Sequence, residues 1–210
     1  MADNKKIYFY IASSLAFLIP VPGRFAFALL LMILFNIQMA TVTLLFHGIY
    51  YMQLSNMRNA ILTLTIIDLG IFYKQLLAIY CPIAALTLGF CIFLPTIASV
   101  IIDFFFLDYS HGLKNHLVRN MKTSCVMSLF SLLVFLLRDI FGYGTITLPG
   151  WRHILVFRLP YNIEGTSASI FLATIPGSLV FVAVLLALYI YGVKKFRIFV
   201  NSPESAGEES

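Results

Sequence analysis

The sequence predicts an all-α, multi-pass membrane protein with six transmembrane helices. Of its 210 residues, 60% are hydrophobic and only 11% are charged, whereas soluble domains carry about 25% charged residues. The mean hydropathy is +0.93, and a soluble core of this size cannot cover so much apolar surface. The apolar residues also form long continuous segments, as helices that cross a bilayer require.

Six apolar segments follow one another, and they cover residues 7–21, 25–50, 60–80, 83–105, 123–141 and 167–193. The first is short for a span of about 20 residues. Pro82 suits the first turn of the fourth helix, and residues 142–166 are the longest stretch predicted to be non-helical. We therefore expect one six-helix membrane domain over residues 1–200 and a polar, disordered tail over residues 201–210.

Prolines are expected to break three of the segments. Pro20 closes the first, Pro95 lies within the fourth, and Pro176 with Gly177 lies within the sixth. Membrane helices tolerate such breaks where neighbouring protein satisfies the freed backbone groups. Broken first and fourth helices suggest two three-helix halves arranged as an inverted repeat, a plan common among transporters.

The basic residues favour an orientation with both termini in the cytoplasm. Six spans place both termini on one side, which then holds nine Lys and Arg residues against four on the other side. Cytoplasmic segments carry such an excess. The net charge of +5 therefore reflects membrane orientation, and we expect no nucleic-acid partner.

Charged residues inside apolar segments are costly in lipid and become candidates for function. Asp68 and Lys74 lie in the third segment, but six residues correspond to about 240° around a helix, so they do not share a face. Lys74 can extend to the membrane surface, whereas Asp68 either contacts a partner helix or lies on an ion path. Asp103 lies near the end of the fourth segment, where a hydrated position is the simpler explanation. His47 is likewise interpreted as interfacial.

The sharpest local feature is the sequence Arg138-Asp139-Ile140-Phe141-Gly142-Tyr143-Gly144, which ends the fifth segment. Glycine adopts the left-handed conformation at helix ends at little cost, so a helix stop with interfacial charges explains the composition. A part in ion coupling is the alternative for the charged pair. Hydrolase, zinc-protease and nucleotide-binding motifs are absent from the sequence, and we assign no catalytic residue and no metal site.

The order of the segments resembles the small six-helix subunits of the Rnf and Nqr complexes, which move electrons and pump sodium ions or protons. The resemblance is closest to the NqrD/RnfE branch of these subunits. It rests on IASSLAFLIPVPGRFAFALLL, LSNMRNAILTLTIIDLGIFYKQLL, LGFCIFLPTIASVII, LLRDIFGYGTI and ASIFLATIPGSLVFVAVLLAL. The most specific features are the R-[DE]-x-x-G-x-G turn that begins at Arg138 and the segment from Ala173 to Gly177.

The resemblance also implies a cofactor that this sequence does not suit. In the family, one Cys on the first helix and one on the fourth, from two facing subunits, hold a [2Fe–2S] cluster. The alignment places Ser14 and Ser99 at these positions, and a serine hydroxyl does not replace the soft thiolate that such a cluster needs. Cys91 lies eight residues before Ser99, about 12 Å along a helix. We therefore expect no cofactor in this chain.

The resemblance thus predicts a subunit of an Rnf/Nqr-type electron transport complex in the bacterial cytoplasmic (inner) membrane, coupled to sodium or proton translocation. The chain would be at most a non-redox part of that oxidoreductase. Its expected partners are the lipid bilayer and other subunits, including a similar six-helix subunit of opposite orientation. Asp68, Asp103, Arg138 and Asp139 are the candidates for ion coupling. A vitamin-type carrier subunit and a scaffold or assembly protein remain the alternatives.

Overall fold

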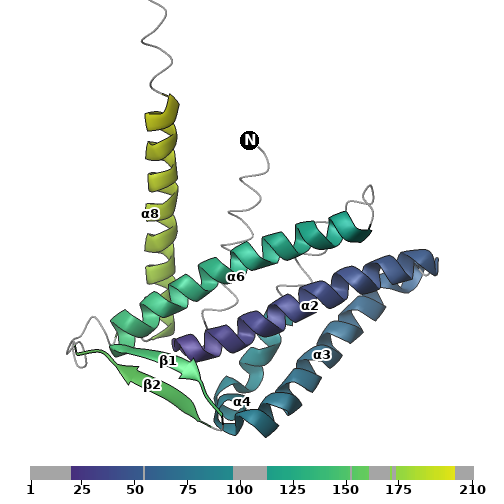
Figure 1. Ribbon diagram of the computed structural model, residues 1–210, viewed down its shortest axis with the longest axis horizontal. Helices are drawn as coiled ribbons and strands as arrows, with labels where there is room; N and C mark the ends of the chain where they lie inside the picture. The colour runs from purple at the N-terminus through teal and green to yellow at the C-terminus, as the bar shows by residue number, and fades with distance from the viewer. Residues whose placement is uncertain are drawn as a thin grey trace, which may run out of the picture.

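The computed structural model describes residues 20–53, 55–96, 113–151, 153–160, 171 and 174–201, and within these ranges the chain is mostly helical (Figure 1). The helices are α2 (Phe25–Tyr51), η1 (Ser55–Met57), α3 (Arg58–Tyr80), α4 (Pro82–Leu88), η2 (Gly89–Phe93), α6 (Leu113–Tyr143) and α8 (Ile175–Asn201). The strands β1 (Thr145–Pro149) and β2 (Ile154–Arg158) form an antiparallel hairpin. The all-α prediction is therefore right for the helices and wrong for the hairpin.

Four of the described helices are long and apolar enough to cross a membrane, namely α2, α3, α6 from Lys114 onward and α8 up to Gly192. The apolar helix Pro82–Thr96 is shorter. The predicted second and third spans match α2 and α3 to within two residues. Most of the predicted first span lies outside the described residues, as do Ser14, Ser99 and Asp103. The described part of the chain thus has the helices of a multi-pass membrane protein.

The boundaries of the later segments differ from the prediction. α6 begins at Leu113, well before residue 123, because its polar first turns contain good helix formers and bury Asn120 against α2. α8 begins at Ile175, and Pro176 lies in its first turn, where the missing N–H costs nothing. Before it, Phe171 is helical and Thr174 forms a bend, and the rest of the predicted sixth segment up to Ile175 lies outside the described residues. In the fourth segment the helix is interrupted at Gly89, which has φ +45°, and Pro95 lies in a helical turn after it.

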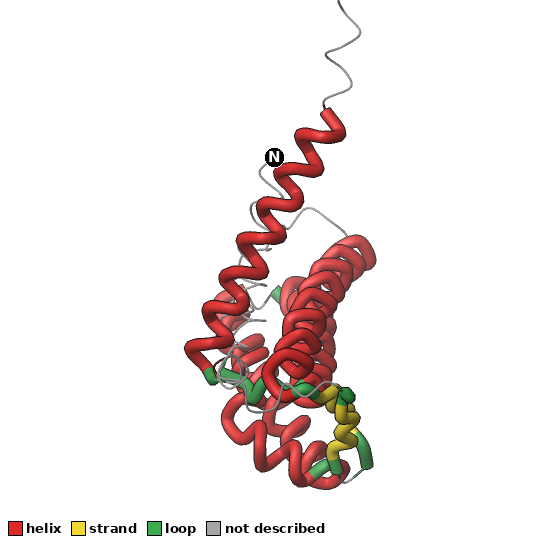
Figure 2. Tube along the Cα trace, turned by 90° about the vertical axis from the view of Figure 1, so that its left-hand side faces the viewer, coloured by secondary structure: helices red, strands yellow, loops and turns green. Residues whose placement is uncertain are grey.

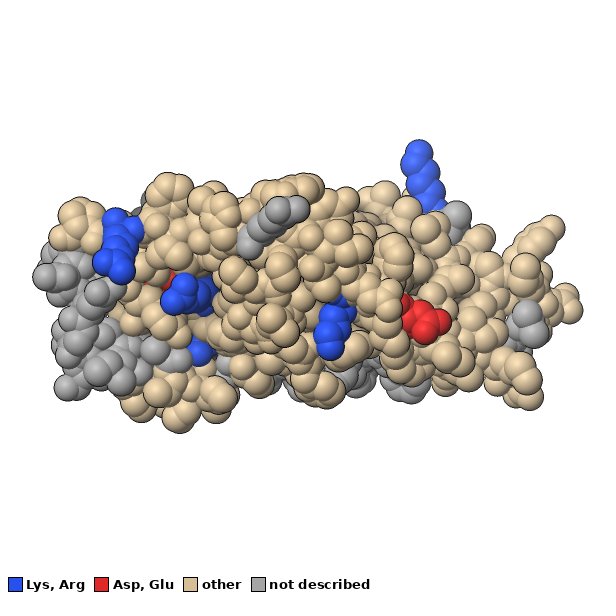
Figure 3. All heavy atoms as spheres, turned by 90° about the horizontal axis from the view of Figure 1, so that it is seen from below, with Lys and Arg blue, Asp and Glu red and all other residues tan. Residues whose placement is uncertain are grey.

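α2 lies between α6 and α3, and buried apolar side chains from these helices and from α4 form the main core (Figure 1). Leu31, Leu77, Ala84 and Phe135 belong to this core. A second cluster joins α2 and α6 to α8 through Val182. Beyond this contact α8 extends away from the other helices (Figure 2). Seen from below, scattered charged side chains interrupt an otherwise uncharged surface (Figure 3).

The helix ends gather at two opposite ends of the bundle. The starts of α2 and α4 and the ends of α3 and α6 lie together with the hairpin, and we call this the hairpin end (Figure 1). The end of α2 and the starts of α3 and α6 lie at the other end. Gly144, with φ +62°, ends α6 and directs the chain into β1. Successive long helices thus run between the two ends of the bundle in opposite directions, as they must in a chain that crosses a membrane repeatedly.

Candidate functional site

The charged pair that ends the fifth predicted segment is buried at the hairpin end. Arg138 is 4% exposed and Asp139 is 0% exposed. A fully buried carboxylate needs hydrogen-bond donors around it, because burying a charge without them is costly. These donors come from β1 and from the start of α2, and we call Arg138, Asp139, Thr145, Thr147 and residues 21–26 the Asp139 node.

Both carboxylate oxygens of Asp139 accept hydrogen bonds. Oδ1 accepts from the hydroxyl of Thr145 at 2.9 Å. Oδ2 accepts from the backbone N–H and the hydroxyl of Thr147, each at 2.8 Å, and from the backbone N–H of Phe25 at 3.2 Å. The first N–H groups of a helix lack partners within the helix, and a negative charge beside them is favourable. Asp139 therefore caps α2, although it lies 114 positions after Phe25 in the sequence.

Thr147 completes the cap. Its hydroxyl accepts a hydrogen bond from the backbone N–H of Ala26 at 3.1 Å and donates to Asp139. The residue before the helix, Arg24, supplies no side-chain cap. The start of α2 thus depends on side chains from α6 and β1, because its own sequence provides no capping group.

Arg138 binds the segment just before α2. Its Nη1 donates to the backbone carbonyl of Val21 at 3.1 Å. The side chain also lies against Gly23, where a Cβ atom would approach Arg138 Nε to 2.5 Å. Nearby, the guanidinium of Arg24 lies 5.5 Å from the centre of the Tyr143 ring, a cation–π contact. The end of α6 therefore holds residues 21–26 through both charged side chains.

A second polar set lies along the interface of α2 and α6, and sequence reasoning missed it. Asn36 donates to Ser128 Oγ at 2.8 Å and accepts from Ser124 Oγ at 2.7 Å, and Asn120 donates to Thr43 Oγ1 at 3.2 Å. We call these five residues the polar seam. The spacing of four along α6, at residues 120, 124 and 128, places them on one helix face, and this pattern could have revealed the seam.

Gln38 provides a polar contact on the opposite side of α2. It is fully buried and donates to Thr96 Oγ1 at 2.9 Å and to the carbonyl of Ile66 at 3.4 Å. Its Oε1 is buried without a hydrogen-bond partner among the described residues. Gln38 therefore connects α2 to α3 and to the fourth segment, and it too escaped sequence reasoning.

The structure brings Arg138 and Asp139 together with the start of α2 but leaves Asp68 elsewhere. Asp68 and Lys74 are exposed on α3. Asp68 makes no side-chain hydrogen bond or ion pair within the described ranges. Asp103, the fourth candidate, lies outside them. Of the four predicted coupling residues, two therefore share one site.

The cysteines that the structure describes do not form a ligand set. Cys81 is buried at the start of α4, Cys91 lies in η2, and Cys125 is exposed on α6. No three His, Cys, Asp or Glu side chains converge as a metal site within the described part of the chain. The two positions that the resemblance assigns to a [2Fe–2S] cluster, Ser14 and Ser99, lie outside the described residues.

The fold and the site define a helical protein with four described helices that could span a membrane, and its buried polar contacts hold these helices to one another. No protein-family model matches the chain, and no curated protein matches it.

Proposed function

We propose that this chain is a membrane-embedded subunit of an Rnf/Nqr-type electron transport complex, coupled to sodium or proton translocation in the bacterial cytoplasmic membrane. The proposal includes six spans in a three-plus-three inverted repeat, both termini in the cytoplasm, and a similar subunit of opposite orientation as partner. It also includes the absence of a redox centre in this chain. The observation that supports it is the Asp139 node.

The node unites two of the stretches on which the family resemblance rests. PVPGRFAF supplies the segment that Arg138 and Asp139 bind, and LLRDIFGYGTI supplies both charged residues and Thr145. Because the two stretches form one hydrogen-bonded unit, their joint presence satisfies a single structural requirement.

The node favours a positioning role for its charged pair. Both Asp139 oxygens already accept hydrogen bonds, and Arg138 is bonded to the carbonyl of Val21. An ion that bound there would have to displace donors that cap α2. We therefore assign Arg138 and Asp139 to holding α2 against α6, while Asp68 and Asp103 remain the candidates for direct ion contact.

Replacing Asp68 by asparagine in the complete complex is expected to lower ion flux per electron by about tenfold, equal to ~1.4 kcal/mol in barrier height. An acid inside a span is costly unless it serves a purpose, and Asp68 has no stabilising partner among the described residues. Ion uptake by vesicles that contain the complex measures the flux. Lys74→Gln, a change of exposed charge on the same helix, is the control. Unchanged flux in an intact complex would favour the scaffold alternative.

Replacing Cys81, Cys91 and Cys125 together by serine is expected to leave the iron content and the iron–sulfur EPR signals of the purified complex unchanged. The resemblance places serine, which cannot readily replace a thiolate, at both cluster positions of this chain, so the complex should hold its iron elsewhere. Loss of an EPR signal in this triple variant, with the subunit composition intact, would show that the chain does ligate a cluster.

A further inference from the structure

The β1–β2 hairpin buries two polar side chains of β1 on its inner face and carries only apolar side chains on its outer face. Residues paired across the two strands share a face. The inner face carries Thr145 and Thr147, which are buried in the Asp139 node. The outer face is formed by two cross-strand pairs, Ile146 with Phe157 and Leu148 with Leu155. Every residue of this outer face is apolar, the reverse of what water favours.

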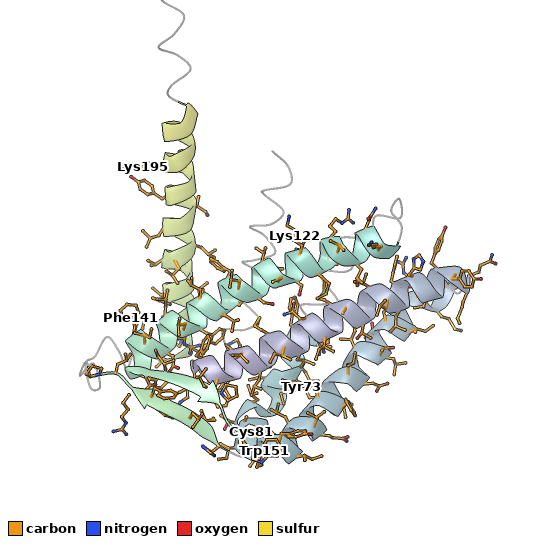
Figure 4. The ribbon with its side chains drawn as sticks, viewed as in Figure 1. Tyr73, Cys81, Lys122, Phe141, Trp151 and Lys195 are labelled. Atoms are coloured by element: carbon orange, nitrogen blue, oxygen red, sulfur yellow. The ribbon has the colours of Figure 1, made fainter. Side chains whose placement is uncertain are left out.

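The apolar surface continues around the turn of the hairpin. Leu155 is 42% exposed, Phe157 is 56% exposed, and Trp151 in the turn is 67% exposed. Trp151 meets the ring of Tyr80 at the end of α3 edge to face, with ring centres 5.1 Å apart, and Figure 4 shows it beside Cys81 at the hairpin end. Trp and Tyr gather where spans leave the hydrocarbon layer.

The position and direction of the hairpin indicate what covers this face. The hairpin lies at the common end of α2, α3 and α6, which is the boundary of the bilayer if these helices span it. In Figure 1, α2 and α6 run across the page and the strands lie below their left-hand ends, and Figure 2 shows the strands at the side of the molecule. The outer face therefore points sideways from the bundle, toward surrounding lipid.

We propose that the β1–β2 hairpin is an interfacial anchor that lies in the lipid headgroup layer, with its outer face and Trp151 against the uppermost acyl carbons. The sheet has two strands, so β2 has a free edge whose backbone groups require water. Hydrocarbon offers none, and Arg158 at the end of β2 is exposed and charged. These groups place the hairpin at headgroup depth. The inference requires only that the helices span a bilayer, whatever complex the chain belongs to.

Trp151 is the one tryptophan in the chain, so intrinsic fluorescence reports its depth directly. The full chain is reconstituted in phosphatidylethanolamine–phosphatidylglycerol vesicles doped with lipid brominated either near the ester linkage or near the acyl-chain end. Shallow bromine is expected to quench Trp151 at least about twofold more strongly than deep bromine. Acrylamide in the water is expected to quench it only weakly.

One double variant and two single variants make the test specific. Trp151→Phe combined with Phe72→Trp moves the fluorophore to an exposed position well inside α3, and it should reverse the preference toward deep bromine. Leu155→Ser on the outer face should weaken quenching by lipid and increase quenching by acrylamide. Val156→Ser is the matched control, because Val156 is 44% exposed on the same strand but belongs to the inner face.

Each remaining outcome overturns the proposal. Strong quenching by acrylamide without quenching by lipid would place the hairpin in water. Protection from both quenchers would mean that protein covers the face, either a second copy or another subunit. Equal effects of Leu155→Ser and Val156→Ser would show that the outer face has no special contact with lipid.

Discussion

Replacing Asp139 by alanine is expected to lower the free energy of unfolding by about 3–5 kcal/mol, because it leaves the N–H groups of Phe25 and Thr147 and the hydroxyl of Thr145 without their acceptor. For a chain of this length such a loss lowers the melting temperature by roughly 10 °C. Thermal unfolding of the purified protein in detergent, followed by circular dichroism, measures the change.

The Asp139→Asn variant keeps a side chain of the same shape but only part of the hydrogen bonds, and so it measures what these bonds contribute. Asparagine at position 139 can keep its oxygen at the Oδ2 position and turn its amide NH2 toward the hydroxyl of Thr145, which can accept. Its cost should therefore be about half that of alanine. Asp68→Ala removes an exposed acid without a described partner and should change stability by less than about 0.5 kcal/mol. Equal stability of the Asp139→Ala and Asp68→Ala variants would contradict the capping role of Asp139.

Replacing Asn36 by leucine is expected to cost about 1–2 kcal/mol, because it removes two hydrogen bonds across the interface of α2 and α6 and a third to the carbonyl of Met32 within α2. Within a bilayer no hydrophobic force drives two apolar helices together, so packing and such polar contacts hold them. The same unfolding experiment measures the loss.

Thr41 offers the matched control for Asn36. It lies on the same helix, and its hydroxyl bonds only to the carbonyl of Ile37 one turn earlier. Thr41→Val should therefore be nearly neutral. If it destabilises the protein as much as Asn36→Leu does, the polar seam contributes nothing beyond the general cost of changing α2.

The long apolar spans were predictable because burial in lipid demands continuous apolar residues. α2 and α3 agree with the prediction for this reason. The start of α6 was missed because its first turns are polar, although they bury Asn120 against Thr43. Pro176 lies in the first turn of α8, a position that helix geometry accepts. Most of the residues just before α8 lie outside the described ranges, so the break expected in the sixth segment stays a prediction.

The hairpin and the Asp139 node were not predicted, and the reasons differ. The stretch TITLP alternates in polarity and ILVFR is rich in strand formers, so a strand signal was present, but the stretch was interpreted as a loop between spans. The charged pair Arg138–Asp139 was singled out correctly as unusual. Its role was beyond sequence reasoning, because Phe25, which Asp139 caps, is 114 positions away.

The most direct test of the proposed function is the identity of the proteins that co-purify with the chain. A tag after residue 210, expressed at native level, allows the intact complex to be extracted in mild detergent and its members to be identified by mass spectrometry. We expect other electron transport subunits together with a second membrane subunit of similar size. Recovery of the chain alone, or with a bound small molecule and no electron transport subunit, would contradict the account.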